Sequence, residues 1–237
     1  MDYKDKQFLD LLNKSNKIVF LTGAGVSTHS GIPDYRSANG IYSDNPEYML
    51  SINCWNKEYL KFLQFITSHF DLKDFEPNDI HKWIVELEKT KDVTVITQNI
   101  DNLHQKAGSA NVIPYHGNVN EWECTGCFES YDFEYVKENN YCKKCGNKLS
   151  PKVVLYGQNI DKQNSENAIK SLLEADLIIV IGTSLAVFPF ADLLTVNPLA
   201  NKVLINKTET ANFYHAFDLV FLEDDLDFIK RIENNET

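Results

Sequence analysis

The sequence predicts an α/β fold in which helices cover both faces of a parallel, doubly wound sheet. Short apolar runs typical of buried parallel strands recur along the chain, and segments with helical periodicity separate several of them. Most of these runs end in glycine or polar residues, as strands do where ligands bind at the carboxyl edge of a sheet. Two segments, 37–91 and 118–150, interrupt the alternation, and we expect a helical module and a cysteine-rich module there.

The first strand is predicted at residues 18–21, after a short amphipathic helix over 3–16. It ends in the turn Thr22-Gly23-Ala24-Gly25, and a second helix is expected directly after this turn. Glycines allow a ligand to come close, and free amides at the start of a helix attract anions, so the turn predicts a phosphate site. An ordinary strand-to-helix connection is an equally good interpretation of these residues alone. Thr28 stands where a dinucleotide fingerprint has its third glycine, which argues against a hydride-transfer dehydrogenase.

The first interrupting segment contains two predicted helices, over residues 55–70 and 79–89, each with apolar residues at helical spacing. His81 lies beside the apolar face of the second helix, and we expect it to be structural. Cys54 is expected to be a small buried hydrophobe.

Two further strands, at 93–96 and 111–114, end in residues suited to chemistry. Gln98, Asn99 and Asp101 follow the first strand and offer amide and carboxylate groups within four residues, although a helix cap would explain any one of them. His116 follows the second strand in Tyr115-His116-Gly117. An imidazole with an ordinary pKa near 6.5 suits a general base.

Four of the five cysteines form two C-x-x-C pairs, at Cys124, Cys127, Cys142 and Cys145. In a reducing compartment this spacing predicts one zinc ion held by two knuckles. Four thiolates leave no open position for water, so the zinc is expected to be structural.

The remaining chain continues the α/β pattern. A helix is predicted at 165–173 and another at the C-terminus, and strands are predicted at 151–157, 177–181, 203–205 and 219–222. The strand at 151–157 either offers an edge to an extended peptide or lies inside the sheet. Gly182-Thr183-Ser184 and Asn206-Lys207 follow two of the other strands and suit phosphate or ribose.

Composition narrows the function further. A net charge of −11 over 237 residues argues against non-specific binding to nucleic acid. The start, MDYKDKQF, is too charged for a signal peptide, and no apolar run approaches the ~18 residues that span a membrane. We therefore expect a cytoplasmic protein without nucleic-acid or membrane partners. The sequence carries no signal for its oligomeric state, and a monomer is the default expectation.

The motifs together resemble the sirtuin family over nearly the whole chain. They are GAGVSTHSGIPDYR, TQNIDNLH, YHG, the paired C-x-x-C, PKVVLYG, GTSLAVFP and INK, in the order and spacing of that family. Sirtuins are NAD-dependent protein deacylases, which transfer an acyl group from lysine to ADP-ribose and release nicotinamide and O-acyl-ADP-ribose. The resemblance implies a Rossmann-like NAD-binding domain at 1–36, 92–117 and 151–237, a helical module at 37–91 and a zinc-binding module at 118–150.

The resemblance also implies roles for individual residues. The catalytic residues would be Asn99 and His116, with His116 as the base. Residues of the predicted loops would bind NAD, namely Gly23, Ala24, Gly25, Thr28, Tyr35, Arg36, Gln98, Asn99, Ile100, Asp101, Gly182, Thr183, Ser184, Asn206, Lys207 and Asp225. An acyl-lysine protein substrate would be clamped as a strand by Val153, Val154, Leu155, Tyr156, Gly157, Val187 and Phe188.

Four positions depart from the family pattern: Tyr35 replaces phenylalanine, Asn102 glycine, Gln158 glutamate and Phe190 a small residue. The loop after Arg36 resembles that of deacetylating bacterial members, which favours acetyl or apolar acyl groups. A mono-ADP-ribosyltransferase, an NAD-glycohydrolase and a non-catalytic NAD-binding module are the alternatives. The presence of Asn99, Asp101 and His116 together argues against the last of these, because simple binding needs no base.

Overall fold

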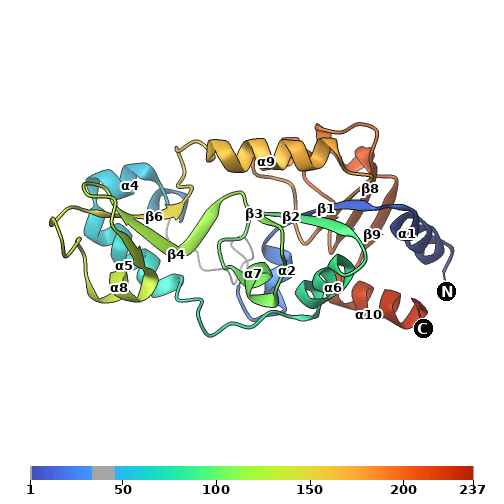
Figure 1. The fold of residues 1–237 in the computed structure, drawn as a ribbon, viewed down its shortest axis with the longest axis horizontal. Coiled ribbons are helices and arrows are strands. Elements are labelled where there is room, and N and C mark those ends of the chain that lie inside the picture. The colour runs from blue at the N-terminus through green and yellow to red at the C-terminus, as the bar shows by residue number, and fades with distance from the viewer. Residues whose placement is uncertain (1, 34–45, 237) are drawn as a thin grey trace.

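A large parallel sheet forms one end of the molecule, and a smaller lobe around an antiparallel sheet forms the other (Figure 1). This computed structural model describes residues 2–33 and 46–236. Both chain ends lie beside the large sheet, so the small lobe is built from internal segments of the chain. Over the described residues, no helix is both long enough and apolar enough to cross a membrane.

The large sheet has six parallel strands in the order β3-β2-β1-β7-β8-β9. Their bounds are β1 Lys17–Thr22, β2 Asp92–Thr97, β3 Val112–Pro114, β7 Leu177–Ile181, β8 Asn201–Asn206 and β9 Leu219–Leu222. The order reverses between β1 and β7, and ligands of open α/β sheets bind outside the carboxyl ends of strands at such a point. This arrangement confirms the predicted Rossmann-like sheet.

Helices cover both faces of this sheet, because alternate residues of each strand point to opposite sides. Ile18 and Phe20 of β1 belong to one hydrophobic cluster, and Val19 and Leu21 belong to the other. The first cluster includes residues of α1 (Tyr3–Lys14), α2 (Ala24–Thr28), α6 (Asp79–Glu88) and α10 (Asp225–Glu236). The second includes residues of α9 (Lys162–Leu173) and of the 3₁₀ helix η1 (Phe190–Thr195). The sheet is therefore doubly wound, as predicted.

The small lobe contains a three-stranded antiparallel sheet in the order β5-β4-β6. Its elements are α3 (Pro46–Met49), α4 (Ile52–Lys57), α5 (Tyr59–His69), β4 (Gly117–Cys124), β5 (Ser130–Asp132), α8 (Phe133–Glu138) and β6 (Leu149–Val153). Phe62 and Ile66 of α5 share one hydrophobic cluster with Trp122 and Leu149 of the sheet. Helices α4 and α5 of the first interrupting segment thus share a core with the cysteine-rich segment, whereas α6 of the same segment packs on the large sheet. Cys54 is fully buried in this cluster, as expected.

Two predicted elements are wrong. The strand predicted at 151–157 ends at Val153 and pairs with β4 in the small sheet, so it is no part of the parallel sheet. The helix predicted over 55–70 is two helices, because the backbone of Glu58 leaves helical geometry between α4 and α5. Five short helices were not predicted: α3, α7 (Leu103–Ala107), α8, η1 and η2 (Tyr214–Ala216).

Candidate functional site

A cleft of about 610 Å³ is lined by both parts of the molecule. The large sheet contributes the loops that follow β1, β2, β7 and β8, and the small lobe contributes Leu50, Phe70 and the segment after β6. The predicted site residues that line it are Ala24, Gly25, Thr28, Gln98, Asn99, Ile100, His116, Val153, Val154, Leu155, Tyr156, Gly157, Gly182, Thr183, Ser184, Val187, Phe188, Asn206, Lys207 and Asp225. Gly23 and Asp101 lie outside the lining, and Tyr35 and Arg36 lie outside the described residues.

The turn after β1 packs directly against the turn after β7. A Cβ on Gly25 would lie 2.7 Å from Gly182 Cα, and one on Gly23 would lie 2.7 Å from Thr183 Cβ. The Gly25 N–H donates to the Gly182 carbonyl at 2.9 Å, and the Val26 N–H donates to the Gly23 carbonyl at 3.2 Å. The expectation that free amides of this turn receive a phosphate is therefore wrong for Gly25 and Val26. The glycines instead allow two turns to meet across the switch point of the sheet.

Polar side chains after β2 form hydrogen bonds with the turns after β1 and β7. Gln98 donates from Nε2 to Thr183 Oγ1 at 2.7 Å, and Asn99 donates from Nδ2 to the Gly23 carbonyl at 2.9 Å. The loops after three neighbouring strands thus form one continuous wall of the cleft. Turns of small residues in this arrangement fit a dinucleotide, whose pyrophosphate needs close backbone approach.

Ser27 is a buried residue behind this wall, and the sequence analysis gave it no role. Its hydroxyl donates to Asp101 Oδ2 at 2.6 Å and accepts from Asn99 Nδ2 at 3.0 Å. Burial raises the pKa of Asp101, while the hydrogen bonds from Ser27 and from the Leu103 N–H lower it. Its place within the motif GAGVSTHSGIPDYR, one turn after Gly23, is the signal that could have indicated it.

Asn102 occupies a backbone conformation that explains one departure from the family pattern. Its φ is 67°, in the left-handed region that glycine adopts freely and asparagine tolerates better than most residues. The replacement of glycine by Asn102 therefore keeps the turn between Asp101 and α7.

His116 lies where β3 passes into β4, on the lining of the cleft. Its Nδ1 is 3.2 Å from the Gln98 carbonyl, which can only accept, so Nδ1 carries the proton. Nε2 is then the nitrogen that can take up a proton. Burial lowers the pKa of His116, and the bond to the Gln98 carbonyl opposes this effect. The imidazole is thus neutral near pH 7 and suited to act as a base.

An acidic corner closes the end of the cleft beside β8. Lys207 forms an ion pair of 2.9 Å with Asp224, which also contacts His29 Nε2 at 3.2 Å. Asp225 is buried behind this pair, and burial together with the Asp224 charge raises its pKa to about 7. Its Oδ1 has no partner among the described residues.

The segment after β6 forms the opposite wall and runs in an extended path between two other segments. The Val154 N–H donates to the His116 carbonyl, and the Tyr156 N–H donates to the Leu50 carbonyl, both at 2.9 Å. The Leu155 N–H donates to Gln158 Oε1 at 2.9 Å, a role that a glutamate could also fill. Across the cleft, Phe188 is about half exposed, as Tyr156 is on this wall.

The four cysteines of the C-x-x-C pairs meet at the far end of the small lobe. Their sulfur atoms lie within 4.8 Å of one another, with Cys124 and Cys145 at 3.3 Å and Cys127 and Cys142 at 3.6 Å. A tetrahedral zinc with Zn–S bonds of about 2.3 Å separates its sulfurs by about 3.8 Å. Backbone N–H groups of Gly126 and Lys144 also point at these sulfurs. The donor set therefore fits one structural zinc ion.

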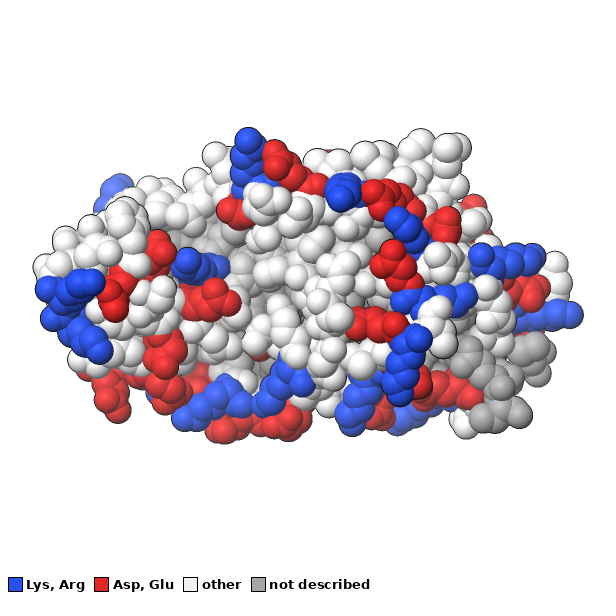
Figure 2. Space-filling model, viewed as in Figure 1, with Lys and Arg blue, Asp and Glu red and all other residues white. Residues whose placement is uncertain are grey.

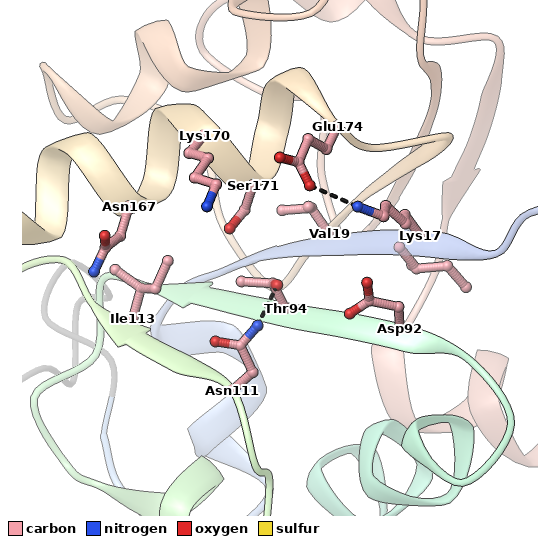
Figure 3. Close-up of a pocket in the computed structure, with 11 residues that line it drawn as sticks. Lys17, Val19, Asp92, Thr94, Asn111, Ile113, Asn167, Lys170, Ser171 and Glu174 are labelled. Atoms are coloured by element: carbon pink, nitrogen blue, oxygen red, sulfur yellow. Dashed lines mark hydrogen bonds and ion pairs between the residues drawn. The ribbon is translucent and has the colours of Figure 1, made fainter.

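A second hollow, of about 280 Å³, lies at the other end of the strands (Figure 3). It is bounded by α9 and by the amino-terminal halves of β1 and β2. Lys17 pairs with Glu174 there at 2.6 Å, and Asn111 donates to Thr94 at 2.6 Å. None of the predicted site residues lines it, so we assign the functional site to the larger cleft.

Comparisons with known proteins agree with this assignment. Residues 23–189 match the model of the Sir2 family. A relative from Staphylococcus epidermidis named NAD-dependent protein deacetylase is 40% identical over 98% of both chains. One of the same name from Listeria monocytogenes is 41% identical over 89% of this chain and 93% of its own.

Solved structures are similar over the whole length. A Sir2 with a p53 peptide and NAD⁺ has a TM-score of 0.89 at 36% identity, covering 98% of both chains. A Sir2 histidine-to-alanine variant with a deacetylated p53 peptide and 3′-O-acetyl-ADP-ribose has a TM-score of 0.90 at 36% identity, covering 97% of both chains.

Proposed function

Because the chain belongs to the Sir2 family, we propose that it is an NAD-dependent protein-lysine deacetylase. It would transfer the acyl group of a modified lysine to ADP-ribose and release nicotinamide. The observation that carries this proposal is the position of His116, a neutral imidazole between dinucleotide-type turns and an extended backbone segment. The relatives' names support a deacetylase over the ADP-ribosyltransferase and NAD-glycohydrolase alternatives.

Bound NAD would supply the ribose that receives the acyl group. The small residues of the β1 and β7 turns would lie against the dinucleotide, with Asn206 and Lys207 at its adenosine end. Gln98 and Asn99 would orient the nicotinamide ribose, and Ile100 and Asp101 the carboxamide. His116 would accept a proton at Nε2 as general base, a role worth about 10²–10⁴-fold in rate.

The substrate would lie as an extended chain between two walls of the cleft. Val153 to Gly157 form one wall and Val187 with Phe188 the other, and their lining positions support this role. The exposed rings of Tyr156 and Phe188 favour acetyl or apolar acyl groups over charged ones. We expect the zinc to hold the small lobe in shape and to take no part in transfer, because four thiolates fill its coordination sphere.

Other features of the protein are also proposals. We propose a monomer that acts in the cytoplasm, where reducing conditions keep the four cysteines free of disulfides and able to bind zinc as thiolates. On the face in Figure 2, Lys and Arg alternate with Asp and Glu along the rims, and the centre is mostly uncharged. This pattern supports a protein without nucleic-acid or membrane partners. We further propose that the parallel sheet acts as the NAD-binding domain, with 37–91 and 118–150 as its attached modules.

The test is to incubate the protein with an acetyl-lysine peptide, with and without NAD, and to follow the products by mass spectrometry. Equal yields of nicotinamide and O-acetyl-ADP-ribose are expected, dependent on both substrates and lost in His116→Ala. Nicotinamide release that does not depend on the peptide would instead favour an NAD-glycohydrolase.

A further inference from the structure

The His116 ring packs against two buried aromatic rings, Tyr115 and Phe190, which lie behind the lining of the cleft. The fully buried Phe190 ring lies 6.1 Å from the imidazole, measured between centroids, with the planes at 46°. The Tyr115 ring lies 5.6 Å from Phe190 and 5.7 Å from His116, edge to face in both pairs. Each ring therefore contacts the other two.

This packing supplies a constraint on His116 that its hydrogen bond does not. The single bond from Nδ1 to the Gln98 carbonyl fixes one point of the ring and leaves its tilt free. Ring-to-ring contacts restrict the tilt, because aromatic pairs favour edge-to-face or offset geometries at these separations. Misplacement of a reacting group by about 1 Å can cost about 10²-fold in rate.

We propose that Phe190 is a positioning residue for His116, whose ring, together with that of Tyr115, fixes the imidazole so that Nε2 serves as the base. The inference rests on the proposed function, in which His116 is that base. Phe190 opens η1, directly after the loop that carries Val187 and Phe188. The contact thus joins the base to the segment proposed to hold the substrate.

The pKa of the His116 imidazole depends on how tightly the neighbouring groups pack around it. Burial raises the pKa of Tyr115, the hydrogen bond with Ser165 of α9 opposes this effect, and the charge of Asp192 in η1 adds to it. On His116 itself, burial lowers the pKa, and the Gln98 carbonyl from the β2 loop raises it. Removal of the Phe190 ring would admit water beside the imidazole and weaken the effect of burial.

The experiment combines an NMR titration of His116 with the pH dependence of kcat in wild type, Phe190→Ala and Phe190→Leu. The matched controls are Phe8→Ala and Phe8→Leu, because Phe8 is also fully buried but packs on the other face of the sheet. In Phe190→Ala, the His116 pKa is expected to rise toward its ordinary value of 6.5. The acid limb of kcat should move with it, since the base must be neutral to act.

We also expect kcat of Phe190→Ala at pH 8 to fall about tenfold, with the KM for NAD changed less than twofold. Phe190→Leu should lie between wild type and Phe190→Ala, and it decides the question if the alanine variant does not fold. The Phe8 variants should lose stability but keep the wild-type His116 pKa and pH profile.

Either of two results would overturn the inference: unchanged His116 titration and kcat in the folded Phe190 variants, or equal changes in the Phe8 variants. If wild type shows no NAD-dependent deacetylation, the proposed function fails. The NMR titration would still report whether Phe190 controls the environment of His116, so the two failures are distinguishable.

Discussion

Ser27→Ala removes the hydroxyl that joins two buried groups beneath the cleft. The change deletes the 2.6 Å bond to the Asp101 carboxylate and the 3.0 Å bond from Asn99. A hydrogen bond to a charged group contributes about 1.5–3 kcal/mol and an ordinary one about 0.5–1.5 kcal/mol. We therefore expect the free energy of unfolding to fall by roughly 2–4 kcal/mol, and Tm by roughly 5–15 °C for a chain of this size.

The loss should also depend on pH, because the Ser27 bond opposes the burial that raises the pKa of Asp101. Without the Ser27 hydroxyl, the Asp101 carboxyl of the folded protein would keep its proton to higher pH, while the same group in the unfolded chain loses it near pH 3.8. Stability then falls as pH rises from that value through the folded-state pKa. The deficit of Ser27→Ala should accordingly be larger at pH 8 than at pH 5.

Urea denaturation at the two pH values, followed by circular dichroism, measures this deficit. Ser15→Ala is the matched control, since Ser15 is also buried but donates only to the Leu11 carbonyl at the end of α1. It should lose about 1 kcal/mol, independent of pH. If the two variants lose the same stability at both pH values, the coupling of Ser27 to a buried carboxylate is refuted.

Three further outcomes are expected. The wild-type protein loses stability as pH rises from about 4 to 7, because the Asp225 carboxyl has a pKa of about 7 in the folded state. The side chain in Asp225→Asn cannot ionise. In urea denaturation the variant should be more stable than wild type by roughly 1–4 kcal/mol at pH 8 and equal to it near pH 4. Zinc chelation should release one ion per chain and shift tryptophan fluorescence to the red as the buried Trp122 becomes exposed; zinc loss without this shift would contradict a structural role. Gly117→Ala would place a Cβ 1.9 Å from the Lys152 carbonyl oxygen, and we expect over 3 kcal/mol of lost stability in urea. Gly108→Ala, also at positive φ but with open space, should lose only about 1–2 kcal/mol.

The parallel strands could be predicted because their signal is local. The strand Leu177–Ile181 is buried on both faces, so its sequence is uniformly apolar and both of its ends were predicted correctly. The strand Leu149–Val153 gave no such signal of its sheet, because pairing with β4 is a long-range choice that its residues do not encode. The break at Glu58 was missed for a related reason: apolar spacing continues across it, and only the backbone geometry of Glu58 separates α4 from α5.

The candidate site divides in the same way. Residue types and motif order indicated His116 and the loops after the strands, and the structure brings these residues to one cleft. What each group contacts there was beyond prediction. Ser27 looked like an ordinary helix residue, and its partner Asp101 lies 74 positions away. The role of the Ser27 hydroxyl comes from its contacts with the Asn99 amide and the Asp101 carboxylate, and no local sequence pattern indicates those contacts.

The glycines of the β1 turn show why a motif alone left two interpretations equally open. A glycine reports that something must come close to the backbone, and does not report what. At Gly25 the approaching group is the Gly182 backbone, from a turn 157 positions later, whose carbonyl takes the Gly25 N–H. The two interpretations, a strand-to-helix connection and a ligand site, are therefore compatible. Where two glycine turns pack on each other, the glycines put no side chain in the way of a dinucleotide. The specificity of the site thus resides in contacts between motifs, which explains why their joint order along the chain was more informative than any one of them.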